Sequence, residues 1–232
     1  MRKMLSTLVL VVSLSMVLQA EPASAGRAKG IDVSQYQDVI NWPAVGNTSI
    51  RFVIARATRG NNYADPMYDF NKDGAEGEGI HFTAYHYAKP NGGKPDALEE
   101  ANHFVDNADL HSGNMIPALD LEQTGGLSPR RMAQWAAIWL NRVQNRIGVK
   151  PMIYTSPSFW RGALDNTRRF AKNGYRLWIA HWFTRNPDVP ARNWSRHGWT
   201  FWQWTDCGSV NGIDGCVDKD RYKGENLGKV EI

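Results

Sequence analysis

Cysteine is scarce in this sequence of 232 residues, which contains only Cys207 and Cys216. A small scaffold held together by disulfides is therefore excluded, because that class needs far more cysteine. No block rich in proline, serine or charge of one sign interrupts the chain, which excludes collagen-like, coiled-coil and disordered classes. With 22% charged and 42% hydrophobic residues, the chain has the length and composition for one large domain with its own core.

Long hydrophobic runs are absent after residue 25. The one apolar stretch, Leu5 to Leu18, follows a positively charged start and precedes Ala23-Ser24-Ala25, which matches an A-x-A cleavage signature. At 14 residues this stretch is shorter than the roughly 20 needed to span a bilayer. The pattern predicts a signal peptide over residues 1–25. The mature protein, residues 26–232, is then expected to be secreted to the extracellular space without a membrane anchor.

Basic residues are in only mild excess, and no basic run is interleaved with aromatic residues, so we expect no nucleic-acid partner. The six histidines show neither HExxH spacing nor zinc-ligand spacing to a cysteine, and we expect no metal or other cofactor. In an oxidising compartment, a disulfide between Cys207 and Cys216 is the favoured interpretation. Two free thiols are the alternative, and a two-cysteine metal site is less favoured still.

Tryptophan is usually the scarcest aromatic residue, yet this chain has ten Trp against eight Tyr and eight Phe. Such a surplus suits a cleft that stacks on flat apolar faces, such as those of sugar rings. Part of the surplus also fits a core. Trp135 and Trp139 recur at helical spacing between residues 128 and 147, which favours packing for these two.

Short β-rich runs alternate with helical segments along the chain. The predicted strands are Lys29–Val33, Arg51–Thr58, Ile80–Tyr87, Met115–Leu121, Val149–Tyr154, Tyr175–Ala180, Trp199–Trp204 and Cys216–Tyr222. The predicted helices are Ser128–Ile147, which Ser128 can cap and Gly148 can end, Pro95–Ala108 and Asp65–Ala75. This alternation predicts an α/β barrel in a single domain. The spacing shortens after residue 175, so we expect an irregular barrel with few helices between its last three strands.

Carboxylates follow several of these strands. Asp120 and Glu122 end the strand that begins near residue 115, and positions i and i+2 of a strand face the same side. Two carboxyls held close in a cleft repel one another, so one keeps its proton, which is what glycosidic cleavage requires. Asp32 follows the first strand, and Asp218 and Asp220 lie in the last. We expect these acids to converge at the mouth of the barrel.

The sequence resembles family-25 glycoside hydrolases, the CH-type lysozymes that act as muramidases on bacterial peptidoglycan. The shared blocks are Gly30-Ile-Asp-Val-Ser-Gln-Tyr-Gln37, Asn41-Trp42, Phe52-Val-Ile-Ala-Arg-Ala-Thr58, Ala84-Tyr-His-Tyr87, Leu119-Asp-Leu-Glu122, Pro151-Met-Ile-Tyr-Thr155, Leu177-Trp-Ile-Ala180, Trp199-Thr-Phe-Trp-Gln-Trp204 and Val217-Asp218. They occur in family order over nearly all of residues 26–232. The resemblance implies one catalytic domain, an irregular TIM-like (β/α)5(β)3 barrel, and hydrolysis of the β-1,4 bond between N-acetylmuramic acid and N-acetylglucosamine with retention.

The resemblance also implies roles for individual residues. Glu122 would be the general acid, and Asp120 would stabilise the cationic or oxazolinium-like intermediate. Asp32 and Asp218 would be the other two acidic members of the site. The expected substrate-binding residues are Tyr85, Tyr87, Trp178, Tyr154 and Gln203. The expected partner is peptidoglycan, and the protein is expected to act as a monomer.

Two features depart from the family pattern. Thr58-Arg59-Gly60 places a positive charge where many relatives have Glu or Gln, and relatives often lack the cysteine pair.

Other functions are alternatives to the one that this resemblance implies. Family-18 chitinases have a D-x-D-x-E strand end, and Ala118 breaks that pattern here. A non-catalytic peptidoglycan- or carbohydrate-binding barrel, or a related glycosidase acting on another N-acetylated glycan, remains the alternative function. His86 has two interpretations, a cleft residue or a hydrogen-bonded core residue, of which the second is the more common.

Overall fold

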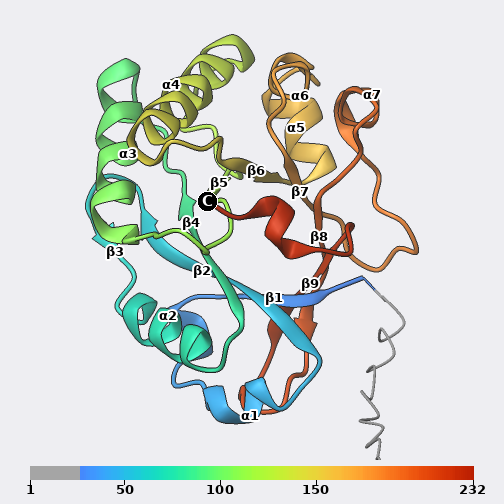
Figure 1. Ribbon diagram of the computed structural model, residues 1–232. Coiled ribbons are helices and arrows are strands. Elements are labelled where there is room, and N and C mark those ends of the chain that lie inside the picture. The colour runs from blue at the N-terminus through green and yellow to red at the C-terminus, as the bar shows by residue number, and fades with distance from the viewer. Residues whose placement is uncertain (1–26) are drawn as a thin grey trace, which may run out of the picture.

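A computed structural model describes residues 27–232, so the predicted signal peptide lies outside the described residues. Eight strands form a closed barrel (Figure 1). These strands are β1 (Lys29–Val33), β2 (Ile50–Arg59), β4 (His81–Tyr87), β5 (Ala118–Asp120), β6 (Met152–Thr155), β7 (Leu177–Ala180), β8 (Phe201–Gly208) and β9 (Val217–Tyr222). A short strand, β3 (Tyr63–Ala64), pairs with the end of β2 outside the ring.

The first seven barrel strands run parallel to one another, from β1 through β8. Only β9 is antiparallel, and it closes the ring between β8 and β1. The irregular, single-domain α/β barrel predicted from the sequence is thereby confirmed. Because all the parallel strands point the same way, their carboxyl ends gather at one mouth of the barrel.

Helices and turns connect the strands and cover the outside of the barrel (Figure 1). They are α1 (Trp42–Gly46), α2 (Tyr68–Gly77), α3 (Lys94–Ala108), α4 (Pro129–Ile147), α5 (Pro157–Ala163), α6 (Arg169–Lys172) and the short turn α7 (Pro190–Ser195), with 3-10 turns η1 (Gln35–Gln37) and η2 (Leu227–Val230). Gly148 ends α4 at φ 82°, as predicted. Ser128 precedes α4 but makes no side-chain cap bond.

The helix predicted from Asp65 begins three residues later. The Asp65 carboxylate accepts hydrogen bonds from the backbone N–H of Met67 at 3.0 Å and of Gln35 at 3.1 Å, and it pairs with Arg56. These contacts hold Asp65 in a turn ahead of α2. A side chain that bonds to the backbone two residues on favours a turn over a helical position.

The core has two parts, one inside the barrel and one between the barrel and its helices. Six tryptophans are less than 2% exposed: Trp135, Trp139, Trp160, Trp178, Trp194 and Trp202. Trp135 and Trp139 pack on the inner face of α4, as predicted. Of the six, only Trp178 also lines the cleft at the barrel mouth described below. The surplus of tryptophan therefore serves packing more than sugar binding.

The chain end closes the opposite mouth of the barrel. The backbone N–H of Ile116 donates to the carbonyl of Val230 at 2.7 Å, and Met115 forms an isolated bridge with Glu231. Leu227 and Val230 of η2 are buried in the core inside the barrel. Figure 1 shows this red segment crossing the front of the barrel.

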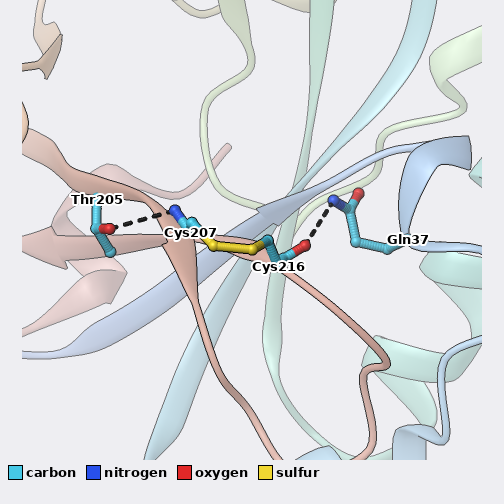
Figure 2. The surroundings of a disulfide bond; sticks show 4 residues. All are labelled: Gln37, Thr205, Cys207 and Cys216. Atoms are coloured by element: carbon cyan, nitrogen blue, oxygen red, sulfur yellow. Dashed lines mark hydrogen bonds between the residues drawn. A yellow bond between two sulfur atoms is a disulfide. The ribbon is translucent and has the colours of Figure 1, made fainter.

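A disulfide joins Cys207, near the end of β8, to Cys216, just before β9 (Figure 2). This confirms the favoured interpretation of the cysteine pair. The backbone N–H of Cys207 donates to Thr205 Oγ1 at 3.2 Å, and Gln37 Nε2 donates to the Cys216 carbonyl at 3.4 Å. The bridge therefore fastens the turn that leads into Asp218, and Gln37 ties this turn to η1.

Within residues 27–232, no helix is long and apolar enough to cross a bilayer.

Candidate active site

A cleft of about 210 Å³ opens at the carboxyl ends of the parallel strands. All nine residues that the sequence nominated for catalysis or substrate contact line it: Asp32, Tyr85, Tyr87, Asp120, Glu122, Tyr154, Trp178, Gln203 and Asp218. They come from β1, β4, β5, β6, β7, β8 and β9 or from the residues directly after these strands. The barrel therefore brings together side chains that are far apart in the sequence.

The central pair lies at the end of β5. Asp120 is the last residue of this strand and is 5% exposed, whereas Glu122 lies just beyond it at the exposed rim. Leu121 between them is buried in the outer core, and its N–H donates to the carbonyl of Tyr154 at 3.0 Å. Strand alternation therefore puts both carboxyls on the cleft side and the leucine on the helix side. Asp120 Oδ1 has no hydrogen-bond partner among the described residues.

Asp32 and Asp218 face each other across the antiparallel pair of β1 and β9, where they are directly opposite in register. Asp220, two residues further along β9, is 1% exposed and lies beneath them. Its Oδ1 accepts a hydrogen bond from Trp178 Nε1 at 2.7 Å. Five acids thus share this small cleft and its floor.

Gln203 connects two other residues of the cleft to Trp182, which lies beside the cleft. Its side-chain Nε2 donates to Asp32 Oδ2 at 2.9 Å, and its Oε1 accepts from the Tyr154 hydroxyl and from Trp182 Nε1, each at 2.9 Å. These bonds fix the amide orientation, because a glutamine that both donates and accepts cannot rotate freely. Gln203 therefore holds Asp32 in one position beside the other acids.

Burial and mutual repulsion raise the pKa values of the acids. Burial, followed by the charges of Glu122 and Asp32, raises the pKa of Asp120 well above its ordinary value. Burial chiefly raises the pKa of Asp218 to about 9 and that of Asp220 to about 7. Burial and the Asp220 charge also raise the pKa of Asp32. The cleft consequently holds protons at neutral pH and has fewer negative charges than carboxyl groups.

The two central carboxyls have different neighbours. Arg56 opposes the rise in the pKa of Asp120, because its positive charge favours the ionised carboxylate. Burial raises the pKa of Glu122, and only the Tyr154 hydroxyl counteracts this. The pKa values of both carboxyls are raised, that of Asp120 well above its ordinary value, so the pair titrates as a coupled unit. What separates the two is position: Asp120 lies buried near Arg56, and Glu122 lies at the rim.

The sequence predicts Asp220 among the acids at the barrel mouth without giving it a role, and it does not single out Arg56. Arg56 is 5% exposed on β2, and its Nε donates to Asp65 Oδ2 at 2.7 Å. A charged residue inside the apolar run from Phe52 to Ala57 was the available signal. For Asp220 the signal was its i+2 spacing from Asp218, the same rule that placed Asp120 beside Glu122.

Two other residues discussed from sequence lie outside the cleft. His86 is fully buried between β4 and the helices, where Nε2 meets Glu100 Oε2 at 2.8 Å and Nδ1 meets Thr58 Oγ1 at 2.7 Å. The core interpretation of His86 is therefore correct. Arg59 does not line the cleft, and its guanidinium lies 4.5 Å from the centre of the Tyr63 ring.

A second depression of about 490 Å³ adjoins the cleft and shares Glu122 as a wall. Trp182, which is 39% exposed, lines it beside Ser156. The Trp182 ring is held by its bond to Gln203, so it offers a fixed aromatic surface next to Glu122. Together the two depressions can hold a polymer on both sides of Glu122.

Within residues 27–232, no group of three His, Cys, Asp or Glu residues is placed to hold a metal ion.

Comparison with known proteins identifies the family. A family model described as "Glycosyl hydrolases family 25" matches residues 31–213, which is most of the chain. The chain belongs to glycosyl hydrolase family 25. It is therefore a glycoside hydrolase, and the resemblance found from the sequence blocks is confirmed.

Curated relatives support this membership of family 25. The chain is 33% identical over 212 residues to lysozyme M1 of Streptomyces globisporus, covering 88% of this chain and 70% of that protein. It is 32% identical over 206 residues to the N,O-diacetylmuramidase of Chalaropsis, covering 82% of this chain and 95% of that one.

Solved structures of lysozymes share the fold. A bacterial lysozyme from Streptomyces coelicolor superposes with a TM-score of 0.81 at 30% identity, covering 89% of this chain and 96% of that chain. A family GH25 lysozyme from Aspergillus fumigatus gives a TM-score of 0.79 at 26% identity, covering 88% of this chain and 99% of that chain. The irregular barrel of family 25 thus extends over nearly all of the described residues.

Proposed function

We propose that this family 25 glycoside hydrolase is a lysozyme that hydrolyses peptidoglycan at the β-1,4 bond from N-acetylmuramic acid to N-acetylglucosamine. The observation that carries the proposal is the pair of carboxyls, Asp120 and Glu122, that share one cleft but have different electrostatic neighbours. The relatives named lysozyme and N,O-diacetylmuramidase support the substrate class.

In the proposed mechanism, Glu122 donates its proton to the glycosidic oxygen as the bond to the anomeric carbon breaks. Its raised pKa favours the protonated form, and its place at the rim lets it meet the leaving sugar. Asp120, next to Arg56, stabilises the positive charge that develops at the anomeric carbon. Water then attacks the intermediate with Glu122 acting as base, which gives net retention.

The nature of the intermediate follows from the substrate. Both sugars carry an acetamido group, whose carbonyl oxygen can attack the anomeric carbon of its own ring. We propose this substrate-assisted route, in which Asp120 stabilises an oxazolinium-like ion and forms no covalent bond to the sugar. Asp32 and Asp218 orient the sugar, and the charge of Asp32 raises the pKa values of Asp120 and Asp218.

The five residues Tyr85, Tyr87, Trp178, Tyr154 and Gln203 are proposed as substrate contacts, because they line the cleft around the acids. Trp178 and Tyr154 pack against each other with ring centres 4.4 Å apart. Tyr87 accepts a hydrogen bond from Gln123 Nε2 at 3.0 Å, next in sequence to Glu122. These aromatic walls are suited to the apolar face of a sugar ring.

The decisive experiment is Glu122→Gln tested on purified peptidoglycan. We expect the rate of lysis to fall by about 10³-fold, the usual contribution of a general acid, with folding and polymer binding retained. Glu99→Gln, an exposed glutamate of α3, is the matched control and is expected to lyse normally. Normal lysis by Glu122→Gln would overturn the assignment of the acid.

The products of the wild-type digest identify the bond. Mass spectrometry is expected to find muramic acid at the new reducing ends. Glucosamine at those ends would indicate the neighbouring glycosidic bond, and free peptide stems would indicate an amidase. Binding without any product would indicate the alternative, a non-catalytic carbohydrate-binding barrel.

We also propose that the protein is exported and acts outside the cell as a monomer. The support for export is the charged start, apolar stretch and Ala23-Ser24-Ala25 signature of the first 25 residues. Amino-terminal sequencing of protein recovered from the culture medium is expected to begin at Gly26. Retention of residues 1–25 in the active protein would contradict export by cleavage, and sedimentation analysis tests the monomer.

A further inference from the structure

A pocket of about 620 Å³ lies at the end of the barrel opposite the catalytic cleft. Its walls include Arg176, directly before β7, and Trp199, shortly before β8, so it lies at the amino ends of these parallel strands. Lys223, directly after the antiparallel strand β9, forms another wall. A ligand in this pocket would leave the catalytic cleft free.

The pocket is positively charged. Arg176, His197 and Lys223 line it, and no Asp or Glu does. Arg176 and Lys223 are the Lys or Arg residues of its walls, and no carboxylate of the lining neutralises them.

The cations are held around an aromatic ring without being neutralised. The Arg27 guanidinium lies 5.2 Å and the Lys223 ammonium 5.9 Å from the centre of the Trp199 ring. Lys223 also donates to the carbonyl of His197 at 3.4 Å, and Arg176 donates to the carbonyl of Lys229 at 3.1 Å. Each of these partners is an uncharged acceptor or a ring, so the positive charges remain available to an anion.

A glycine makes room for one of these cations. Gly198 has φ +70°, and a Cβ atom there would lie 2.8 Å from Lys223 Nζ. A side chain at this position would therefore crowd the ammonium group as well as strain the backbone. The local backbone is thus compatible with Lys223 reaching over Trp199 into the pocket.

We propose that this pocket binds a phosphodiester-linked anionic polymer of the cell wall, so that the enzyme is held on its substrate while the catalytic cleft acts. Several fixed cations without a competing acid suit repeated phosphate groups. Nucleic acid fits less well, because Trp199 is only 9% exposed and has cations over its ring, which leaves no open face for a base. The proposal uses the proposed function only to place the enzyme at a wall.

The test compares Arg176→Glu/Lys223→Glu with the wild-type protein. A matched control, Lys94→Glu/Arg131→Glu, makes the same change in charge at two exposed residues of α3 and α4, away from the pocket. Binding is measured on whole walls and on walls from which hydrofluoric acid has removed phosphodiester polymers. Hydrolysis is measured separately on soluble, phosphate-free peptidoglycan fragments.

We expect the wild type and the control to bind whole walls about tenfold more tightly than extracted walls, which is about 1.4 kcal/mol. Arg176→Glu/Lys223→Glu should lose this difference and still hydrolyse the soluble fragments at the wild-type rate. The wild-type preference should also weaken as salt is added.

Three results would overturn the proposal. One is an unchanged preference for whole walls in Arg176→Glu/Lys223→Glu, and another is an equal loss in the control, which would indicate general surface charge. The third is tighter binding of a single-stranded oligonucleotide than of a polyglycerol phosphate with equal charge. Failure of the proposed lysozyme activity would appear separately, as absence of hydrolysis by the wild type.

Discussion

At the scale of single residues, the site depends on where carboxyls lie relative to apolar walls and to one cation. The i and i+2 rule places Asp120 beside Glu122 from sequence alone. The same rule applies to Asp218 and Asp220, but the sequence did not show that Asp220 is buried beneath Asp32. That burial depends on Trp178, which comes from another strand and donates its indole N–H to Asp220.

Tyr154 lets the proposed general acid, Glu122, be tested through its pKa. Its hydroxyl lowers the pKa of Glu122, which burial otherwise raises, so Tyr154→Phe should raise that pKa further. The general acid must be protonated to act, and the alkaline limb of the kcat/KM profile should therefore move to higher pH. Tyr68→Phe, which removes a buried hydroxyl bonded to the carbonyl of Ala108, should leave the profile in place. An alkaline limb that stays fixed or moves to lower pH in Tyr154→Phe would argue against Glu122 as the acid.

At the scale of elements, periodicity predicted the helices and strands that have a regular apolar pattern. The nineteen-residue α4 begins and ends where Pro129 and Gly148 indicate. The short elements α1, α5, α6, α7 and β3 were not predicted, because none of them is long enough to show a periodic pattern. Asp65 was assigned to a helix but forms a turn, since its carboxylate bonds to Arg56 and to nearby backbone N–H groups.

The turn between β8 and β9 allows a prediction about the disulfide. Cys207 and Cys216 are nine positions apart, and closing a loop of that size contributes about 2.5 kcal/mol in the chain-entropy account. Cys207→Ser/Cys216→Ser should lower the free energy of unfolding by about this amount in a denaturant titration under oxidising conditions. Under reducing conditions the wild type should fall to the level of the variant. Equal stability of the oxidised wild type and the variant would show that the bridge does not hold this turn.

At the scale of the whole molecule, closing the barrel gathers five acids at one mouth and basic residues at the other. The acids come from β1, β5 and β9 and from Glu122 just after β5. The basic residues of the opposite pocket flank β7, β8 and β9. Neither cluster is visible as a run in the sequence, because each takes residues from segments that only the ring of strands makes adjacent.

The buried acids make the stability of the whole domain depend on pH. The folded-state pKa of Asp220 is about 7 and that of Asp218 about 9, both raised chiefly by burial from an ordinary value of 3.8. At pH values between 3.8 and the folded-state pKa of each group, the folded chain holds a proton that the unfolded chain has released. The free energy of unfolding therefore falls as pH rises through this range. Denaturant titrations at pH 5 and pH 8 should show a smaller fall for Asp220→Asn than for the wild type.

Asp214→Asn is the control for this measurement, since Asp214 lies in an exposed turn between β8 and β9. This variant should keep the pH dependence of the wild type. If the free energy of unfolding of Asp220→Asn falls between pH 5 and pH 8 as much as that of the wild type and of Asp214→Asn, Asp220 does not titrate in the proposed way.

The sequence by itself determined the alternation of strands and helices, the ordered blocks of family 25 and the carboxyls at the ends of strands. These are local properties, set by side-chain periodicity and by the two-residue repeat of a strand. Only the tertiary structure decided that Trp202 packs in the outer core, that Asp220 is buried, that Arg56 lines the acidic cleft, and that a basic pocket lies at the other end. The burial of a residue and the electrostatic potential at it depend on all the residues that lie close to it in space. In the barrel these neighbouring residues come from every part of the chain.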